Sequence, residues 1–172
     1  GKVGSLTVRN FFVFDLGGLI EPLGSLSLNI ASTGSYITPD TEETVTFRSY
    51  EGDPGFLING SFGLSNYADL GDGTVYASLT VDTPVADVSA PMPAVTISLS
   101  EAAVAAVNAI IAAPDDPGDA NDKLFAFGGE LVTAPASTQG LWFVDSGPGA
   151  VTLTGTPAAI PLPGALPLAA AG

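Results

Sequence analysis

Two residue types that carry much of protein chemistry are missing from this sequence. Its 172 residues include no cysteine and no histidine. Without cysteine there is no disulfide framework and no thiol nucleophile, and without both residue types there is no Cys/His zinc site. A Ser-His-Asp triad is excluded for the same reason. These absences remove every class of site that depends on a thiol or an imidazole.

Basic residues are scarce. The chain carries 4 Lys+Arg against 18 Asp+Glu, which gives a net charge of −14 and a pI of about 4.1. Such a surface repels phosphate backbones and anionic lipid headgroups, so we expect no nucleic-acid partner. Cations, Ca²⁺ above all, are its natural counter-partners. The alternative is that the acidity only keeps the protein soluble.

Long apolar runs are missing as well. No stretch of 18 apolar residues occurs, so no part of the chain is expected to span a membrane. Apolar residues nevertheless make up 46% of the chain and the mean hydropathy is +0.41, which indicates one domain with a real core rather than disorder. The 21 glycines and 14 prolines are dispersed, which is typical of short strands joined by turns.

The densest aromatic stretch runs from Arg9 to Leu16. Its even positions are almost all apolar, and its odd positions still hold Phe11 and Val13. A strand that is apolar on both faces is covered on both sides. The pattern therefore predicts that residues 6–15 form a central strand around which the other strands are built.

Apolar and polar residues alternate in several later segments, which predicts further strands. These are residues 25–30, 44–48, 74–81, 95–99, 124–127, 131–132, 141–144 and 151–154. Asn59–Gly60 lies between two apolar runs and predicts a β-hairpin turn. Gly128–Gly129 indicates a bulge or a tight corner.

One segment changes its period from two to between three and four residues. Val104, Val107 and Ile111 belong to an apolar stripe that predicts a helix over about residues 100–113. Its start is indicated either by the Ser-x-x-Glu pattern of Ser98 and Glu101 or by Ser100 as a direct N-cap, and Pro114 is the stop. The expected fold is all-β, a jelly-roll-like β-sandwich of about nine short strands with this one short helix. The domain is expected to span residues 1–155.

The loop after this helix concentrates hard oxygen ligands. Asp115, Asp116, Asp119 and Asp122 form a candidate weak Ca²⁺ site, although the spacing lacks the acidic twelfth position of an EF-hand. A solvated loop is the alternative. Paired carboxylates here and at Glu42–Glu43 would suit a glycosidase, but all of them sit beside turn residues, where Asp is favoured for backbone reasons. We expect no enzyme and no cofactor, Ca²⁺ being the one possible exception.

Two tyrosines fall on strand faces that the alternation predicts to point outward. Tyr50 and Tyr76 are therefore candidates for an aromatic platform that binds sugars. Trp142 lies in a strongly apolar segment and is expected in the core.

The chain changes character at Thr156. Residues 156–172 carry no charge and contain four prolines. Proline interrupts both helices and central-strand ladders, so this tail is expected to be an extended peptide outside the domain. An uncharged apolar tail is costly to leave in water and needs a membrane, a groove or a partner subunit.

Several stretches together resemble a class of bacterial secreted proteins with C-terminal sorting signals. Four segments match that class in order: Arg9 to Leu19, the alternating Ser and Leu at 26–28, the acidic segment 39–44, and the helix 99–113 followed by Phe125–Gly129. The tail segment Ile160, Pro161, Leu162, Pro163, Gly164 and Ala165 resembles the VPLPA variant of the PEP-CTERM signal, with Ile160 and Gly164 in place of the usual Val and Ala.

This resemblance implies Sec-dependent export in a Gram-negative bacterium. It implies an exosortase that reads residues 160–165, and delivery to the cell surface or the extracellular matrix. Contact with the membrane would be transient and would use a tail extension that is not part of this chain. Such proteins usually carry more residues before the Arg9 strand, so an N-terminal strand is expected to be missing or trimmed.

These observations favour a secreted, non-enzymatic structural protein of the cell surface or matrix. A jelly roll that lacks one strand exposes backbone donors and acceptors, which an extended segment of a neighbour can complete. We therefore expect self-assembly into filaments or sheets, with the tail or the N-terminus as the donor. The alternative is a cell-surface module that binds an extracellular polysaccharide.

Overall fold

The computed structural model describes the backbone of residues 2–3, 6–7, 9–31, 35–37, 42–60, 63–82, 94–132, 140–142 and 151–159. Side chains are described in these ranges except at 2–3, 6–7, 35–37 and 140–142. All statements below concern these residues. The expected sorting motif at 160–165 and the side chain of Trp142 lie outside them.

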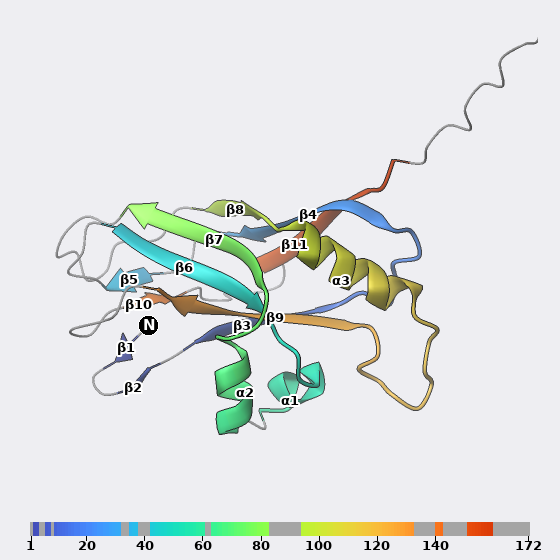
Figure 1. Ribbon diagram of the computed structural model, residues 1–172, viewed down its shortest axis with the longest axis horizontal. Coiled ribbons are helices and arrows are strands. Elements are labelled where there is room, and N and C mark those ends of the chain that lie inside the picture. Colours follow the sequence, from blue (N-terminus) through green and yellow to red (C-terminus); the bar gives the residue numbers. More distant parts are fainter. Residues whose placement is uncertain are drawn as a thin grey trace, which may run out of the picture.

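Two antiparallel sheets form the body of the protein (Figure 1). The first contains β3 (Asn10–Asp15), β9 (Leu124–Leu131), β6 (Glu42–Ser49) and β7 (Val75–Asp82), in that order. The second contains β11 (Val151–Pro157), β4 (Leu23–Ile30) and β8 (Val95–Ser98). Two short pairs join β1 (Lys2–Val3) to β2 (Leu6–Thr7) and β5 (Ser35–Ile37) to β10 (Gly140–Trp142).

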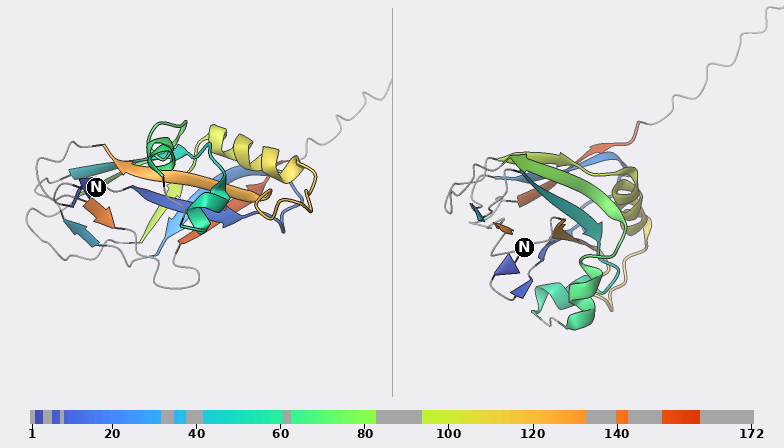
Figure 2. Two further views of the ribbon diagram at one scale, coloured as in Figure 1. Left: turned by 90° about the horizontal axis from the view of Figure 1, so that it is seen from below. Right: turned by 60° about the vertical axis from the view of Figure 1, so that its left-hand side comes forward.

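Three helices accompany these strands in the described part of the chain. They are α1 (Pro54–Ile58), α2 (Leu64–Asp69) and α3 (Glu101–Ala112). Among consecutive strands of the two sheets, only β6 and β7 are neighbours in the same sheet, and every other connection crosses between the sheets. The predicted all-β sandwich is confirmed. Helix α3 and the pair α1–α2 occupy different positions around it (Figure 2).

The main core lies between the two sheets. It combines Phe12, Phe47 and Phe127 of the first sheet with Leu26, Leu28 and Ile97 of the second, and α3 adds Ala103 and Val107. Both helix residues are fully buried, and α3 contacts β4, β7 and β9. The predicted helix is confirmed together with its apolar stripe. Ser100 occupies the N-cap position, but its hydroxyl donates to the Val75 carbonyl oxygen at 3.3 Å instead of capping the helix.

The prediction that residues 6–15 form one central strand is wrong in two respects. The segment is divided between β2 and β3, and β3 is the terminal strand of its sheet, where β9 and β6 are the inner strands. Its two faces are nevertheless both covered, as predicted. Phe12 belongs to the main core, and Phe11 and Val13 pack against a second cluster formed by Tyr50, Leu57, Leu70 and Ala126.

The predicted hairpin at Asn59–Gly60 is also wrong, because this turn follows a helix. Asp53 is the N-cap of α1, its Oδ1 accepts a hydrogen bond from the Gly55 amide at 2.7 Å, and Pro54 fits the first helical turn. Gly60 does adopt the left-handed conformation, with φ 69°. This is the backbone conformation that an Asn-Gly pair favours, and here it occurs in a turn after a helix instead of in a hairpin. Leu57 is buried in the second cluster, so packing supports the helix.

Gly128 and Gly129 form no bulge. Strand β9 runs in unbroken register past both glycines, against β3 on one side and β6 on the other. The glycines are there because other groups approach the strand closely from its two faces: Leu70 at Gly128 and the Phe47 ring at Gly129.

The last strand extends slightly beyond the expected domain boundary at residue 155. Strand β11 continues to Pro157, and the Ala158 amide donates to the Pro22 carbonyl oxygen at 2.9 Å. The chain is therefore attached to β4 and the turn before it as far as Ala158.

Candidate functional site

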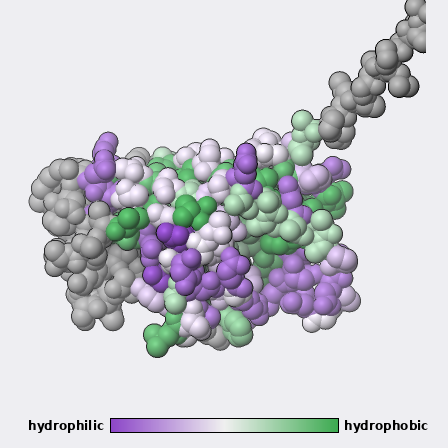
Figure 3. All heavy atoms as spheres, in the orientation of Figure 1, coloured by the Kyte–Doolittle hydropathy of each residue, from purple (hydrophilic) through white to green (hydrophobic). Residues whose placement is uncertain are grey.

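The acidic loop between α3 and β9 forms a hydrophilic area at one corner of the protein (Figure 3, lower right). Its carboxylates bind the loop's own backbone. Asp116 Oδ1 accepts from the Gly118 amide at 2.9 Å, Asp119 Oδ1 from the Asn121 amide at 2.8 Å, and Asp122 Oδ2 from the Asp116 amide at 2.6 Å. Asp115 lies 3.2 Å from the Lys123 ammonium. No group of three or more acidic residues that could hold a metal ion occurs in the described residues.

Tyr50 and Tyr76 are not on the surface, which corrects their assignment as outward-facing aromatics. Only 7% of Tyr50 and 6% of Tyr76 is exposed. Tyr50 packs in the second cluster, under the α1–α2 segment. Tyr76 packs in the main core, 5.8 Å from Phe125 between ring centroids. Neither side chain can serve as a platform for a sugar.

A β-bulge explains the changed face of Tyr76. Phe47 pairs with Ala77 and Arg48 pairs with Val75, so Tyr76 is an extra residue with no residue opposite it. The bulge reverses the alternation on one side of it, which turns Tyr76 inward and leaves Val75 exposed. The Tyr76 carbonyl oxygen accepts a hydrogen bond from the Ser100 amide at 2.7 Å.

The buried tyrosines should make the protein less stable in alkali. Burial raises the pKa of Tyr50, and the charges of Asp69 and Asp53 raise it further. Burial and then the charge of Glu51 raise the pKa of Tyr76, while a hydrogen bond with Ser49 lowers it.

Below pH about 10 both tyrosines are protonated in the folded and the unfolded chain, so their contribution to the free energy of unfolding is fully present. As pH rises further, the unfolded chain releases these protons first, so stability falls by up to about 1.4 kcal/mol per pH unit for each tyrosine. Urea unfolding at about pH 9, 10 and 11 measures this slope, and a flat profile would contradict it.

The Tyr50 hydroxyl group is buried and has no hydrogen-bond partner among the residues that the structure describes. We expect Tyr50→Phe to leave stability unchanged or to raise it by about 1 kcal/mol, because an unsatisfied buried polar group is removed at almost constant shape. Tyr76→Phe is the matched control and should not stabilise the protein, since its hydroxyl interacts with Ser49. Paired urea titrations at neutral pH compare the two, and a loss above about 1 kcal/mol in Tyr50→Phe would disprove the expectation.

Three of the four basic residues are engaged inside the fold. Arg9 forms an ion pair with Glu130 at 2.7 Å and lies over the Tyr67 ring, 4.4 Å from its centroid. Its guanidinium also donates to the carbonyl oxygens of Tyr67 and Ala68, which connects β9 to α2. Arg48 donates to the Gly73 carbonyl oxygen, and Lys123 donates to those of Ile110 and Ala113 at the end of α3. These cations act as structural connectors, so the negative charge of the chain is poorly compensated elsewhere.

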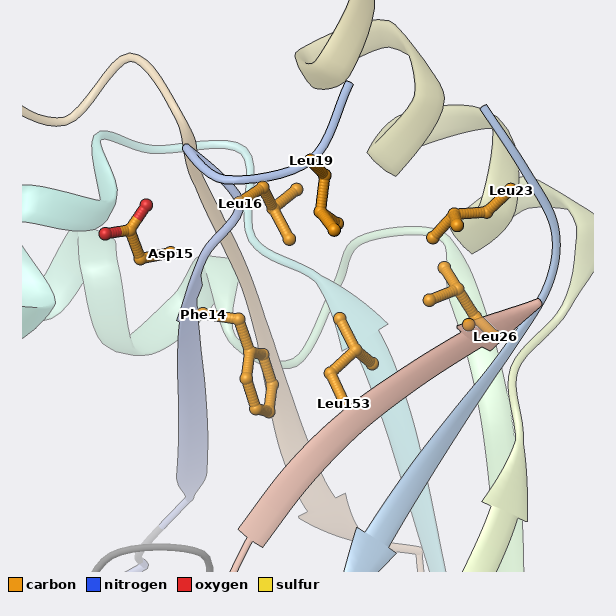
Figure 4. A pocket seen from close by; sticks show the side chains of 8 residues that line it. Phe14, Asp15, Leu16, Leu19, Leu23, Leu26 and Leu153 are labelled. Atoms are coloured by element: carbon orange, nitrogen blue, oxygen red, sulfur yellow. The ribbon is translucent and has the colours of Figure 1, made fainter. Parts of the chain in front are cut away.

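The strongest candidate for a binding site is an apolar cleft at one side of the sandwich. It has a volume of about 260 Å³ and lies between the ends of β3 and β11, which terminate the two sheets. Figure 4 shows Phe14, Leu16 and Leu19 on one side of it, with Leu153 and Leu26 facing them. The lining comprises Phe14, Asp15, Leu16, Leu19, Leu23, Leu26, Leu153 and Gly155.

The chemistry of the cleft is that of apolar binding. The carboxylate of Asp15 points away from the space (Figure 4) and accepts a hydrogen bond from the Gly17 amide at 2.8 Å. Leu19 of the lining is 43% exposed, and the residue that follows it, Ile20, is 86% exposed. The volume lies below the range of about 300–1,000 Å³ that is usual for small-molecule pockets, and suits a few apolar side chains better than a whole ligand.

The sequence analysis did not identify this cleft. It is formed by residues 14–26 and 153–155, which are distant in the chain and meet because β11 pairs with β4. Only the leucines at 16, 19, 23 and 26 gave a local signal, and their spacing does not fit one strand.

None of the helices in the described residues combines the length and the apolar character needed to cross a bilayer. In comparisons with known proteins, no protein family, no curated protein and no solved structure matches this sequence.

Proposed function

We propose that the protein is a secreted, non-enzymatic structural component of a bacterial cell surface or extracellular matrix, and that its copies assemble by strand complementation. One observation carries this proposal. One terminal strand of each sheet, β3 and β11, flanks an apolar cleft, and the chain continues from β11 into an uncharged, proline-containing segment.

Terminal strands are natural sites of association because their outer backbone groups can pair with another chain. Among the described strands, β11 pairs with β4 along one edge and with none along the other. No proline or charged side chain protects the run Val151–Thr156 of β11. Natural proteins usually protect such edges with lysine, proline or a covering segment. The edge of β11 is therefore the acceptor that we assign to a strand from another copy.

The proposed location is supported by the resemblance to exported bacterial proteins with sorting signals. The segment 160–165 would be read by an exosortase during export, and the protein would then reach the cell surface or the matrix. The net charge of −14 supports a partner that is neither nucleic acid nor an anionic membrane. The polysaccharide-binding alternative has lost its support from Tyr50 and Tyr76, because both are buried.

Sedimentation velocity and negative-stain electron microscopy of the purified chain test the proposal. We expect filaments or sheets, and more of them at high than at low salt. Each copy has a net charge of −14, and salt screens the electrostatic repulsion between copies. Dispersed monomers at every salt concentration would refute the proposal. Saturable binding of such monomers to one polysaccharide would favour the alternative.

We infer that assembly does not require Ca²⁺, because the carboxylates of the acidic loop already bind the loop backbone. A weak extracellular site with a Kd of about 1 mM would stabilise the fold by about 1.4 kcal/mol at about 10 mM Ca²⁺. Thermal unfolding with Ca²⁺ and with a chelator should give the same Tm, and electron microscopy the same particles. A saturable increase in Tm that disappears in an Asp116→Asn Asp122→Asn variant would contradict this inference.

A further inference from the structure

We propose that residues 160–164 of one copy form the donor strand, that they add to the outer edge of β11 in the next copy, and that Ile160 and Leu162 enter its apolar cleft. This inference rests on the proposed function and specifies which segment joins which edge.

The spacing of the prolines in the tail suits a strand that pairs along one edge only. In an extended chain the N–H and C=O groups of successive residues point to opposite edges, so those of alternate residues point to the same edge. Residues 160, 162 and 164 keep their N–H groups, and all three groups point to the same edge. Pro161 and Pro163 have no N–H and block the other edge. The segment can therefore complete a sheet without offering a new edge of equal quality.

The same alternation directs the side chains. Ile160 and Leu162 are two residues apart, so they lie on one face of an extended segment. The cleft beside β11 is lined by Phe14, Leu153 and further leucines, and its volume of about 260 Å³ suits a few such side chains. Neither the segment nor the leucines around the cleft carry a charge, so the contact adds no electrostatic repulsion to that between the acidic domains.

The tail of the same copy cannot place residues 160–164 on its own β11. The chain is bound to β4 and Pro22 as far as Ala158, so only Ala159 precedes the donor segment. Reversal of the chain needs a turn of at least two residues, usually with glycine or asparagine. The donor must therefore come from another copy. Because donor and acceptor are different parts of the chain, the contact is head-to-tail and leads to open filaments or closed rings.

The test compares four full-length or truncated chains by sedimentation velocity. These are the chain ending at Gly172, the chain truncated after Ala159, Leu162→Pro and Ala165→Pro. Truncation after Ala159 keeps every described residue and should abolish assembly. Leu162→Pro removes an N–H from the pairing edge, and the concentration needed for assembly should rise about tenfold or more. Ala165→Pro is the matched control, because its N–H points to the edge that Pro161 and Pro163 already block, so assembly should be unchanged.

The outcomes separate this inference from the function on which it rests. If the full chain assembles and the truncated chain assembles equally well, the tail is not the donor, although the structural function stands. Equal effects of Leu162→Pro and Ala165→Pro would overturn the one-edge pairing. If the full chain remains monomeric, both the inference and the proposed function fail. Circular dichroism of each variant confirms that the sandwich is folded.

Discussion

Phe127→Ala is expected to lower the free energy of unfolding by about 3–5 kcal/mol, which is the usual cost of truncating a buried phenylalanine. Phe127 is fully buried on the inner strand β9. Its ring lies 5.4 Å from that of Phe12, 6.2 Å from that of Phe47 and 5.5 Å from that of Phe125, measured between centroids. These rings belong to β3, β6 and β9, so the substitution opens a cavity where three strands of the first sheet meet the core.

Phe56→Ala is the matched control for this experiment. Phe56 lies on α1 and is 49% exposed, so its loss should cost less than about 1 kcal/mol. Urea unfolding followed by tryptophan fluorescence and circular dichroism gives both values. Similar losses in the two variants would show that the aromatic cluster is not the centre of the fold.

Gly128→Ala is expected to destabilise the protein by about 1–3 kcal/mol or more, even though it adds one methyl group. A Cβ at this position would lie 2.6 Å from the Leu70 carbonyl oxygen and 2.7 Å from its Cδ2. Backbone atoms cannot move aside as the end of a flexible side chain can. Either β9 or the turn after α2 must therefore shift, which would disturb the second cluster around Tyr50 and Leu57.

Gly129→Ala makes the same chemical change on the opposite face of β9. Its Cβ would meet the Phe47 ring at 3.3 Å, a contact that a small movement of the ring relieves. Restricting the unfolded chain favours alanine by about 0.4–1 kcal/mol, so the net effect should be close to zero. Thermal and urea unfolding compare the two variants. A larger loss in Gly129→Ala than in Gly128→Ala would contradict the described packing.

The sequence predicted best those elements whose pattern is decided by one buried face. The stripe through Val104, Val107 and Ile111 predicted α3 because a helix on the side of a sandwich buries one side only. The alternation of Leu26, Leu28 and Ile30 with serine and asparagine predicted β4 for the same reason. These two elements formed where the pattern placed them, and the fold class was predicted from such segments.

Predictions failed where a second layer or an irregularity changed the pattern. Helix α1 packs against β3 and β9 on the face of the first sheet that points away from the main core, and Tyr50, just beyond the end of β6, is buried there with Leu57 and Leu70. Because that segment was predicted as a hairpin, no cover was expected there. The inward position of Tyr76 depends on a bulge in β7 that no glycine or proline marks.

The sequence could not predict the apolar cleft for a further reason. A dense aromatic run showed that β3 is covered on both faces but did not show that it ends its sheet, because position in a ladder depends on hydrogen bonds rather than on side-chain character. The cleft forms only because β3 and β11, each a terminal strand of its sheet, lie at the same side of the sandwich. The tail, by contrast, was recognisable from composition alone, and its proline spacing carries the pairing argument without any tertiary information.

Hydrogen–deuterium exchange as a function of protein concentration tests the central claim most directly. If copies join at the edge of β11, amides in peptides covering residues 151–158 and 160–164 become protected as assembly proceeds, while those of α2 keep the same exchange rate. Assembly without new protection in β11 would contradict the account, and so would a chain that shows no concentration dependence at all.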